Sequence, residues 1–184
     1  MGFGKNILLL IVAPAYGWQR IGRTSVPTQI MLSRLLYPLL ALLAVTAFAP
    51  MLYGDEATLP ACVQEAVILF AKFYFGYQLT SVALTVCFKD VAADADKTLR
   101  VNCAIVYNMA ILVLLGIINN LLPAPWVMIQ VLEFYIVYVS LKSADYLGVK
   151  RNHAYLYVLA GFVIVLPHFI SYLLHLLLSV TIGV

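Results

Sequence analysis

The sequence predicts an all-α fold, a polytopic bundle of five transmembrane helices with an N-terminal interfacial segment. The first observation is composition: 64% of the 184 residues are hydrophobic, 10% are charged, and the mean hydropathy is +1.00. Globular domains average roughly 45–50% apolar and about 25% charged residues. The second is that several apolar runs reach the roughly 20 residues needed to cross a hydrocarbon core of about 30 Å as a helix. The third is the segregation of Lys and Arg between alternate connections.

The N-terminal part of the chain, residues 1–34, is expected to be cytoplasmic or interfacial. Its opening apolar stretch is interrupted by Pro14 and Gly17, so it is too short to span a bilayer. Aromatic side chains often mark the membrane surface. We therefore expect this segment to lie in the interface, with Trp18 at headgroup depth.

The five helices follow from the apolar runs, and no linker divides the chain, so residues 1–184 are predicted to form a single integral membrane domain. The helices lie near residues 35–52, 63–88, 101–122, 125–141 and 154–184. The fourth is short and is expected to extend toward Tyr146, where Lys142 can snorkel to the interface. Pro123 and Pro125 indicate a tight hairpin between the third and fourth helices, which should therefore be neighbours.

Charge patterning predicts the orientation of the chain. Of the 11 Lys and Arg residues, all except Lys72 fall on one side of the membrane when five helices alternate across it. The first connection instead carries Asp55 and Glu56, and the third carries no charge. Short loops rich in Lys and Arg remain in the cytoplasm. We expect a cytoplasmic N-terminus, an external C-terminus and a bacterial cytoplasmic (inner) membrane.

Binding motifs for metals, cofactors and nucleic acids are absent from the sequence. The formal net charge of +3 is explained by topology-determining bases, which can also contact anionic lipids, so no nucleic-acid partner is expected. The three Cys residues lack CxxC pairing, and the acidic loop 89–97 lacks the turn Gly and final Glu of a calcium loop. There is no GxSxG, HExxH or phosphate-binding loop. We expect no metal, no cofactor and no enzymatic activity.

A candidate polar site follows from ionisable residues predicted to lie at membrane depth. Lys72 is nine residues past Val63 and Glu133 eight past Pro125, so they lie roughly 14 and 12 Å below the external surface. Such charges are costly and default to functional candidates. We hypothesise that Lys72 and Glu133 pair, as helix-packing contacts or as part of a substrate or ion pathway; the alternative is that each side chain snorkels independently. Glu65 shares the Lys72 face, so it extends this site toward the exterior or, in the simpler account, reaches water near the helix end.

Two histidines on the last predicted helix are weaker candidates. His168 and His175 are seven residues apart, so they share a face and lie roughly 10 Å apart along the axis. This separation is too long for a shared metal ion without further ligands. The alternatives are a proton relay, since His titrates near neutrality, and hydrogen-bonded packing beside Pro167, where freed backbone carbonyls need partners.

Several short stretches follow a recognisable order. They are Asn6–Pro14, Gly17–Ile21, Leu36–Leu42, Tyr107, Leu115–Asn119 with Pro123, and Tyr138–Val149. This order resembles bacterial Yip1-domain proteins, a family of small five-helix membrane proteins. The resemblance carries no enzymatic residues over to this chain. Eukaryotic Yip1 relatives are membrane factors of vesicle traffic that associate with prenylated Rab-type GTPases, whereas the bacterial branch has no settled activity.

Two functions are therefore expected from the sequence. The first is a Yip1-like role through association with membrane lipids, other membrane proteins or further copies of the chain. The alternative is a small channel or transporter subunit with a polar site at Lys72 and Glu133. A hydrated cavity around Lys72 favours the second function, whereas a dry ion pair beside an exposed groove favours the first.

Overall fold

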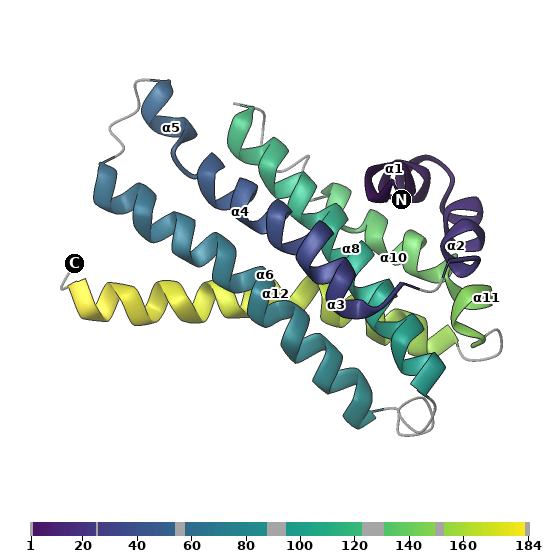
Figure 1. Ribbon diagram of the computed structural model, residues 1–184. Helices are drawn as coiled ribbons and strands as arrows, with labels where there is room; N and C mark the ends of the chain where they lie inside the picture. Colours follow the sequence, from purple (N-terminus) through teal and green to yellow (C-terminus); the bar gives the residue numbers. More distant parts are fainter. Residues whose placement is uncertain are drawn as a thin grey trace.

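The computed structural model describes residues 2–24, 26–53, 58–87, 95–122, 131–149 and 153–182, and the regular structure in these ranges is helical. Four helical stretches are long and apolar enough to cross a membrane, namely Thr28–Thr46, Leu59–Cys87, Ala95–Leu121 and Ala154–Leu178. Two shorter apolar helices, Phe3–Val12 and Val131–Leu141, accompany them. The protein is thus an all-helical membrane-type bundle with four long candidate spans (Figure 1).

The first long helix differs from its predicted position at residues 35–52. It comprises α3 (Thr28–Met31), a π-helical turn η1 (Leu32–Leu36) and α4 (Tyr37–Thr46), and the short α5 (Ala49–Leu52) follows it. Residues 28–34 therefore continue into this helix, whereas the sequence predicted that the helix begins at residue 35. The π-helical turn accommodates Pro38, which lacks an N–H and crowds the preceding turn. The Tyr37 N–H correspondingly donates to the Leu32 carbonyl, five residues back.

The other three long helices are α6 (Leu59–Cys87), α8 (Ala95–Leu121) and α12 (His153–Ile182), close to the predicted second, third and fifth helices. α8 is the central helix of the bundle: 72% of its most apolar window is buried, against 33–39% for the other spans. It packs against α4 and α6, and it also touches α12, α1 (Phe3–Val12), α10 (Tyr135–Leu141) and α11 (Ala144–Leu147). A helix enclosed in this way is expected to be apolar on all sides.

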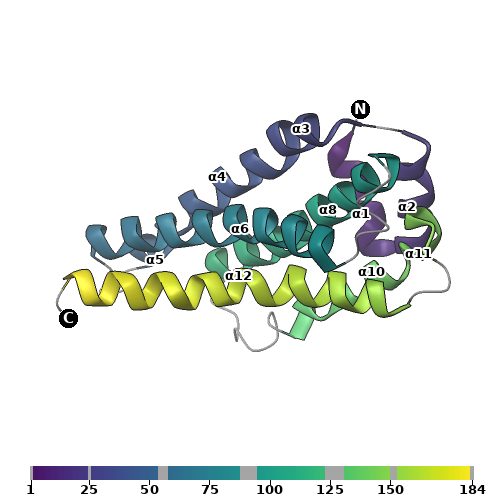
Figure 2. The same cartoon turned by 90° about the horizontal axis from the view of Figure 1, so that it is seen from below.

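α12 packs against α6 and runs in the opposite direction; the two ribbons cross in Figure 1 and lie alongside each other in Figure 2. Toward one end His175 contacts Glu65, and toward the other the Thr80 hydroxyl lies 3.5 Å from the Phe162 carbonyl. Between these contacts the helices approach closely at Gly76. A Cβ atom there would lie 2.9 Å from Cγ of Pro167.

The N-terminal segment folds into two packed helices, α1 (Phe3–Val12) and α2 (Pro14–Gly22). α1 lies across the direction of α12, not along it (Figure 2). Gly17 allows the close approach of the two helices, because a Cβ there would lie 2.9 Å from a Leu10 methyl group and 3.0 Å from the Leu10 nitrogen. This segment therefore contributes to the protein core as well as to its surface.

Trp18, which we expected at headgroup depth, is buried inside the protein, so its indole faces other residues and not a surrounding lipid layer. It is 1% exposed, and its indole stacks on Tyr146 with ring centroids 5.2 Å apart. Its Nε1–H donates to the Val139 carbonyl over 2.9 Å. The Val139 carbonyl lies near the end of a helix, where the Ser143 N–H donates to the Ser140 carbonyl and not to that of Val139. The buried position thus supplies a donor to a backbone group that the helix leaves open.

The fourth predicted helix, residues 125–141, is described only from residue 131. A helical turn at 131–133 leads into α10 (Tyr135–Leu141), and α11 (Ala144–Leu147) follows, ending at Gly148 with φ +70°. The 11 residues of Val131–Leu141 extend about 16 Å, roughly half of a hydrocarbon core. Residues 125–130 lie outside the described part of the chain.

Basic side chains gather where α2, α11 and the start of α8 meet. Arg100 donates to the Tyr146 carbonyl over 3.2 Å, and a neighbouring cavity is lined by Arg100, Lys142 and Gln19. An adjoining cavity is lined by Gln19 with Arg20 and Arg23. The sequence predicted that all of these bases lie on the cytoplasmic side. The fold places them together at one end of the bundle.

Candidate intramembrane site

A cavity of about 200 Å³ lies between α6, α8, α12 and the segment that leads into α10. It contains the three residues of the predicted polar site together with one of the two weaker candidates. Its lining comprises Glu65, Leu69, Lys72, Phe73, Leu112, Gly116, Asn119, Asn120, Glu133, Pro167 and His168. The fold thus brings together charged and amide side chains from four separate segments.

Lys72 lies on the wall formed by α6, half-buried, with its Nζ 5.1 Å from the centre of the Phe73 ring. Glu65 lies two turns away on the same face. In the part of the chain that the structure describes, no carboxylate oxygen comes within 4.0 Å of the Lys72 ammonium. The direct Lys72–Glu133 pair that we expected is therefore not formed, although both residues line one cavity.

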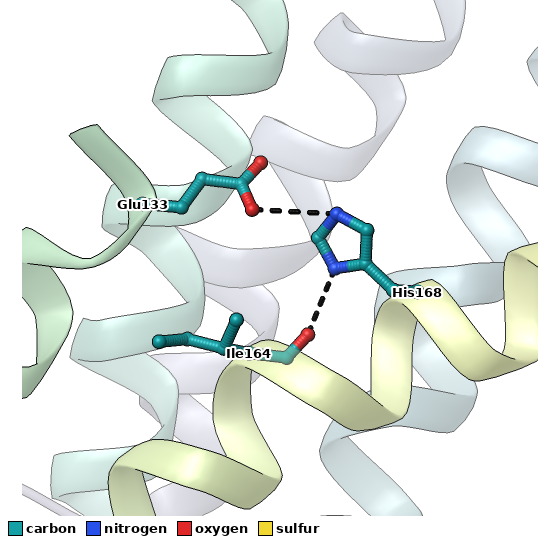
Figure 3. A network of polar contacts seen from close by, with 3 residues as sticks. All are labelled: Glu133, Ile164 and His168. Atoms are coloured by element: carbon teal, nitrogen blue, oxygen red, sulfur yellow. Dashed lines mark hydrogen bonds and ion pairs between the residues drawn. The ribbon is translucent and has the colours of Figure 1, made fainter. Parts of the chain in front are cut away.

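Glu133 instead contacts His168, with 3.3 Å between its Oε2 and the imidazole Nε2 (Figure 3). The Glu133 side chain is 22% exposed and that of His168 is 55% exposed. The other ring nitrogen, Nδ1, lies 2.9 Å from the Ile164 carbonyl. Pro167 has no N–H to donate to the carbonyl of Val163, four residues before it. The Nδ1 contact of His168 is instead with Ile164, so the expectation that His168 serves a carbonyl freed by Pro167 stays a prediction.

The second histidine also contacts a carboxylate. His175 Nε2 lies 3.8 Å from Glu65 Oε2, and the two side chains are 52% and 44% exposed. Each predicted histidine therefore faces one of the two predicted carboxylates. Within the described ranges, no group of three or more His, Cys, Asp or Glu residues is placed to hold a metal ion.

The wall formed by α8 contributes amide groups. The Asn120 Nδ2 donates to the Thr46 hydroxyl over 3.0 Å, and that hydroxyl donates to the Leu43 carbonyl. This chain of hydrogen bonds fixes the orientation of the Asn120 amide at the cavity wall. Asn119 and Asn120 line the cavity and were not among the residues predicted for the polar site.

The pairing of His168 with Glu133 was not anticipated from the sequence, although a signal for it exists. His168 is 14 residues beyond Ala154, so it lies about 21 Å from the cytoplasmic start of its predicted helix, within reach of the depth estimated for Glu133. Judged only by estimated depth in the membrane, Lys72 is an equally good partner for Glu133. The direction in which each helix presents its side chains decides between them.

No family model, curated protein or solved structure matches this chain. The resemblance to Yip1-domain proteins therefore stays a prediction.

Proposed function

We propose that this protein is a small channel or transporter subunit whose intramembrane cavity binds a small polar solute or ion. The supporting observation is the cavity of about 200 Å³ around Lys72, Glu65, Glu133 and His168. A charge in mid-membrane costs about 2.5–3.5 kcal/mol on an insertion scale. Water or a polar ligand in the cavity offsets this cost, because it solvates groups that lipid cannot.

The size of the cavity limits what it can bind. Its volume corresponds to roughly six or seven water molecules at about 30 Å³ each. This suits a hydrated ion or a solute of a few heavy atoms. The walls carry positive, negative and amide groups, so binding relies on charge and hydrogen bonding, and the proposed role involves no covalent chemistry.

The proposed placement in the membrane completes the predicted topology. In this placement the segment Val131–Leu141 belongs to a fifth crossing, with the N-terminus in the cytoplasm and the C-terminus outside. The basic end formed by Arg20, Arg23, Arg100 and Lys142 supports this orientation, because such residues favour the cytoplasmic side. The proposed location is the bacterial cytoplasmic membrane.

Cysteine labelling tests whether water reaches the cavity. In a background without Cys62, Cys87 and Cys103, Lys72→Cys should react with a charged, membrane-impermeant methanethiosulfonate reagent, because a thiol ionises only in water. Val67→Cys is the matched control on α6. Val67 is 58% exposed, does not line the cavity, and lies about 140° around the helix from residue 72.

The expected result is rapid labelling of Lys72→Cys and little labelling of Val67→Cys, although residue 67 is nearer the helix end. Equal labelling of the two positions, or none at residue 72, overturns the proposal. Adding candidate solutes to the reaction then identifies those that protect the introduced cysteine.

A second candidate function is association with another membrane protein or a second copy of the chain, as the Yip1 resemblance implies. The observation that favours it is the half-exposed imidazoles of His168 and His175 beside exposed Phe169 and Tyr172 on α12. Polar groups facing lipid are costly, so a protein neighbour would cover them. Native mass spectrometry from nanodiscs tests this role, and a bare monomer argues against it.

A further inference from the structure

The protonation of His168 is constrained by its two neighbours. The Ile164 carbonyl is only an acceptor, so the ring nitrogen that faces it over 2.9 Å, Nδ1, must carry a hydrogen. The opposite tautomer would place the Nδ1 lone pair against the carbonyl oxygen. A neutral His168 therefore leaves Nε2 without a hydrogen, facing the Glu133 carboxyl group (Figure 3).

The contact between Nε2 and Glu133 then requires a proton of its own. An unprotonated Nε2 and an ionised carboxylate are both acceptors, and they would repel each other over 3.3 Å. One added proton makes the contact favourable in either of two forms. It yields an imidazolium facing a carboxylate, or a neutral imidazole accepting a hydrogen bond from a carboxylic acid.

We propose that His168 and Glu133 together hold one exchangeable proton, so that the pair is a proton-binding site of the intramembrane cavity. This inference deepens the proposed channel or transporter function and rests on it for the route by which the proton reaches water. A proton leaving the cavity leaves both residues without a shared hydrogen, and a proton entering restores the hydrogen bond. Binding of a solute or ion in the cavity is thereby coupled to proton exchange at His168 and Glu133.

The proton shared by His168 and Glu133 determines the net charge of the cavity. The other charged groups that line the cavity with the pair are Glu65 and Lys72 of α6, and His175 of α12 contacts Glu65. The residues that α8 contributes to the described lining carry no charge. With the proton bound, the pair of Glu133 and His168 is neutral overall, and Lys72 balances Glu65. Loss of the proton leaves one net negative charge, which changes the affinity of the cavity for any charged solute.

Nitrogen NMR of ¹⁵N-histidine-labelled protein in nanodiscs tests the proposal directly. In the wild type, Nδ1 of His168 should be protonated at every pH, and acidification should add one proton to the pair. In Glu133→Gln, the carboxamide can itself donate to Nε2, so His168 should stay in the neutral Nδ1–H form where the wild type gains its proton. Glu65→Gln is the matched control, expected to alter His175 and leave His168 unchanged.

Proton uptake after a pH jump gives a second readout, which also detects a proton that resides on the carboxyl group. Glu133→Gln should take up one proton per chain fewer than the wild type over the pH range in which the wild-type pair gains its proton. The proposal is overturned if neutral His168 carries its hydrogen on Nε2, or if Glu133→Gln takes up as many protons as the wild type.

The two proposals fail in different ways. A labelled Lys72→Cys together with a proton-free pair overturns this inference and leaves the channel or transporter function intact. An unlabelled Lys72→Cys together with a protonated pair overturns the function and leaves the proton on His168 and Glu133.

Discussion

The close approach of α6 and α12 at Gly76 predicts a specific cost for adding one methyl group. In Gly76→Ala, the new Cβ would lie 2.9 Å from Cγ and 3.4 Å from Cδ of Pro167. A proline ring cannot rotate out of the way as a long side chain can. The two helices must therefore move apart beside His168, which follows Pro167 directly and lines the cavity.

The expected magnitude combines two opposing effects. Overpacking by one methyl group typically costs about 1–3 kcal/mol, whereas alanine gains up to about 1 kcal/mol over glycine in a helix. We expect Gly76→Ala to lower the free energy of unfolding by about 1–2 kcal/mol. Gly161→Ala on α12 is the matched control, because a Cβ there meets no heavy atom within 4 Å, and it should be neutral or slightly stabilising.

Unfolding of the purified protein in mild detergent mixed with increasing sodium dodecyl sulfate measures both variants against the wild type. The midpoint should fall for Gly76→Ala and stay level or rise for Gly161→Ala. If Gly76→Ala proves at least as stable as Gly161→Ala, then the two helices can separate freely and the steric reasoning fails.

Two further substitutions test the buried hydrogen bonds of the bundle. Trp18→Phe keeps an aromatic ring but leaves the Val139 carbonyl without its donor, so the same unfolding assay should show a loss of about 1–3 kcal/mol; wild-type stability would mean that water or another group serves that carbonyl. Ser140→Ala removes the acceptor of the buried Asn108 amide, which should cost about 0.6–1.7 kcal/mol. Adding Asn108→Leu should recover part of this loss, and additive losses in the double-mutant cycle would contradict a direct coupling.

The helical class and the long apolar spans could be predicted from composition and run length. Lipid offers no hydrogen bonds, so a long apolar segment must satisfy its own backbone groups as a helix. The predicted second, third and fifth helices correspond closely to α6, α8 and α12. The first predicted helix began too late in the chain. Hydropathy assigns the polar residues before Leu35 to a loop, although they continue the helix through the π-helical turn ahead of Pro38.

The residues of the candidate site could also be chosen from the sequence, since charge inside an apolar run is visible without any coordinates. Axial rise placed Lys72 and Glu133 at similar depths, and both line one cavity. Their partners could not be chosen in this way. Rise gives the depth of a side chain, whereas its direction around the bundle depends on how each helix packs against its neighbours.

The sequence by itself determined that this chain is helical, which stretches are apolar enough to cross a membrane and which ionisable residues lie within them, because these properties depend on local composition and on the fixed geometry of a helix. Only the tertiary structure decided that Glu133 contacts His168 and not Lys72, and that Trp18 of α2 is buried against Tyr146 and the Val139 carbonyl. Both outcomes depend on the rotation and crossing of helices, which are set by contacts between residues far apart in the chain, such as Gly76 with Pro167 and Trp18 with Val139.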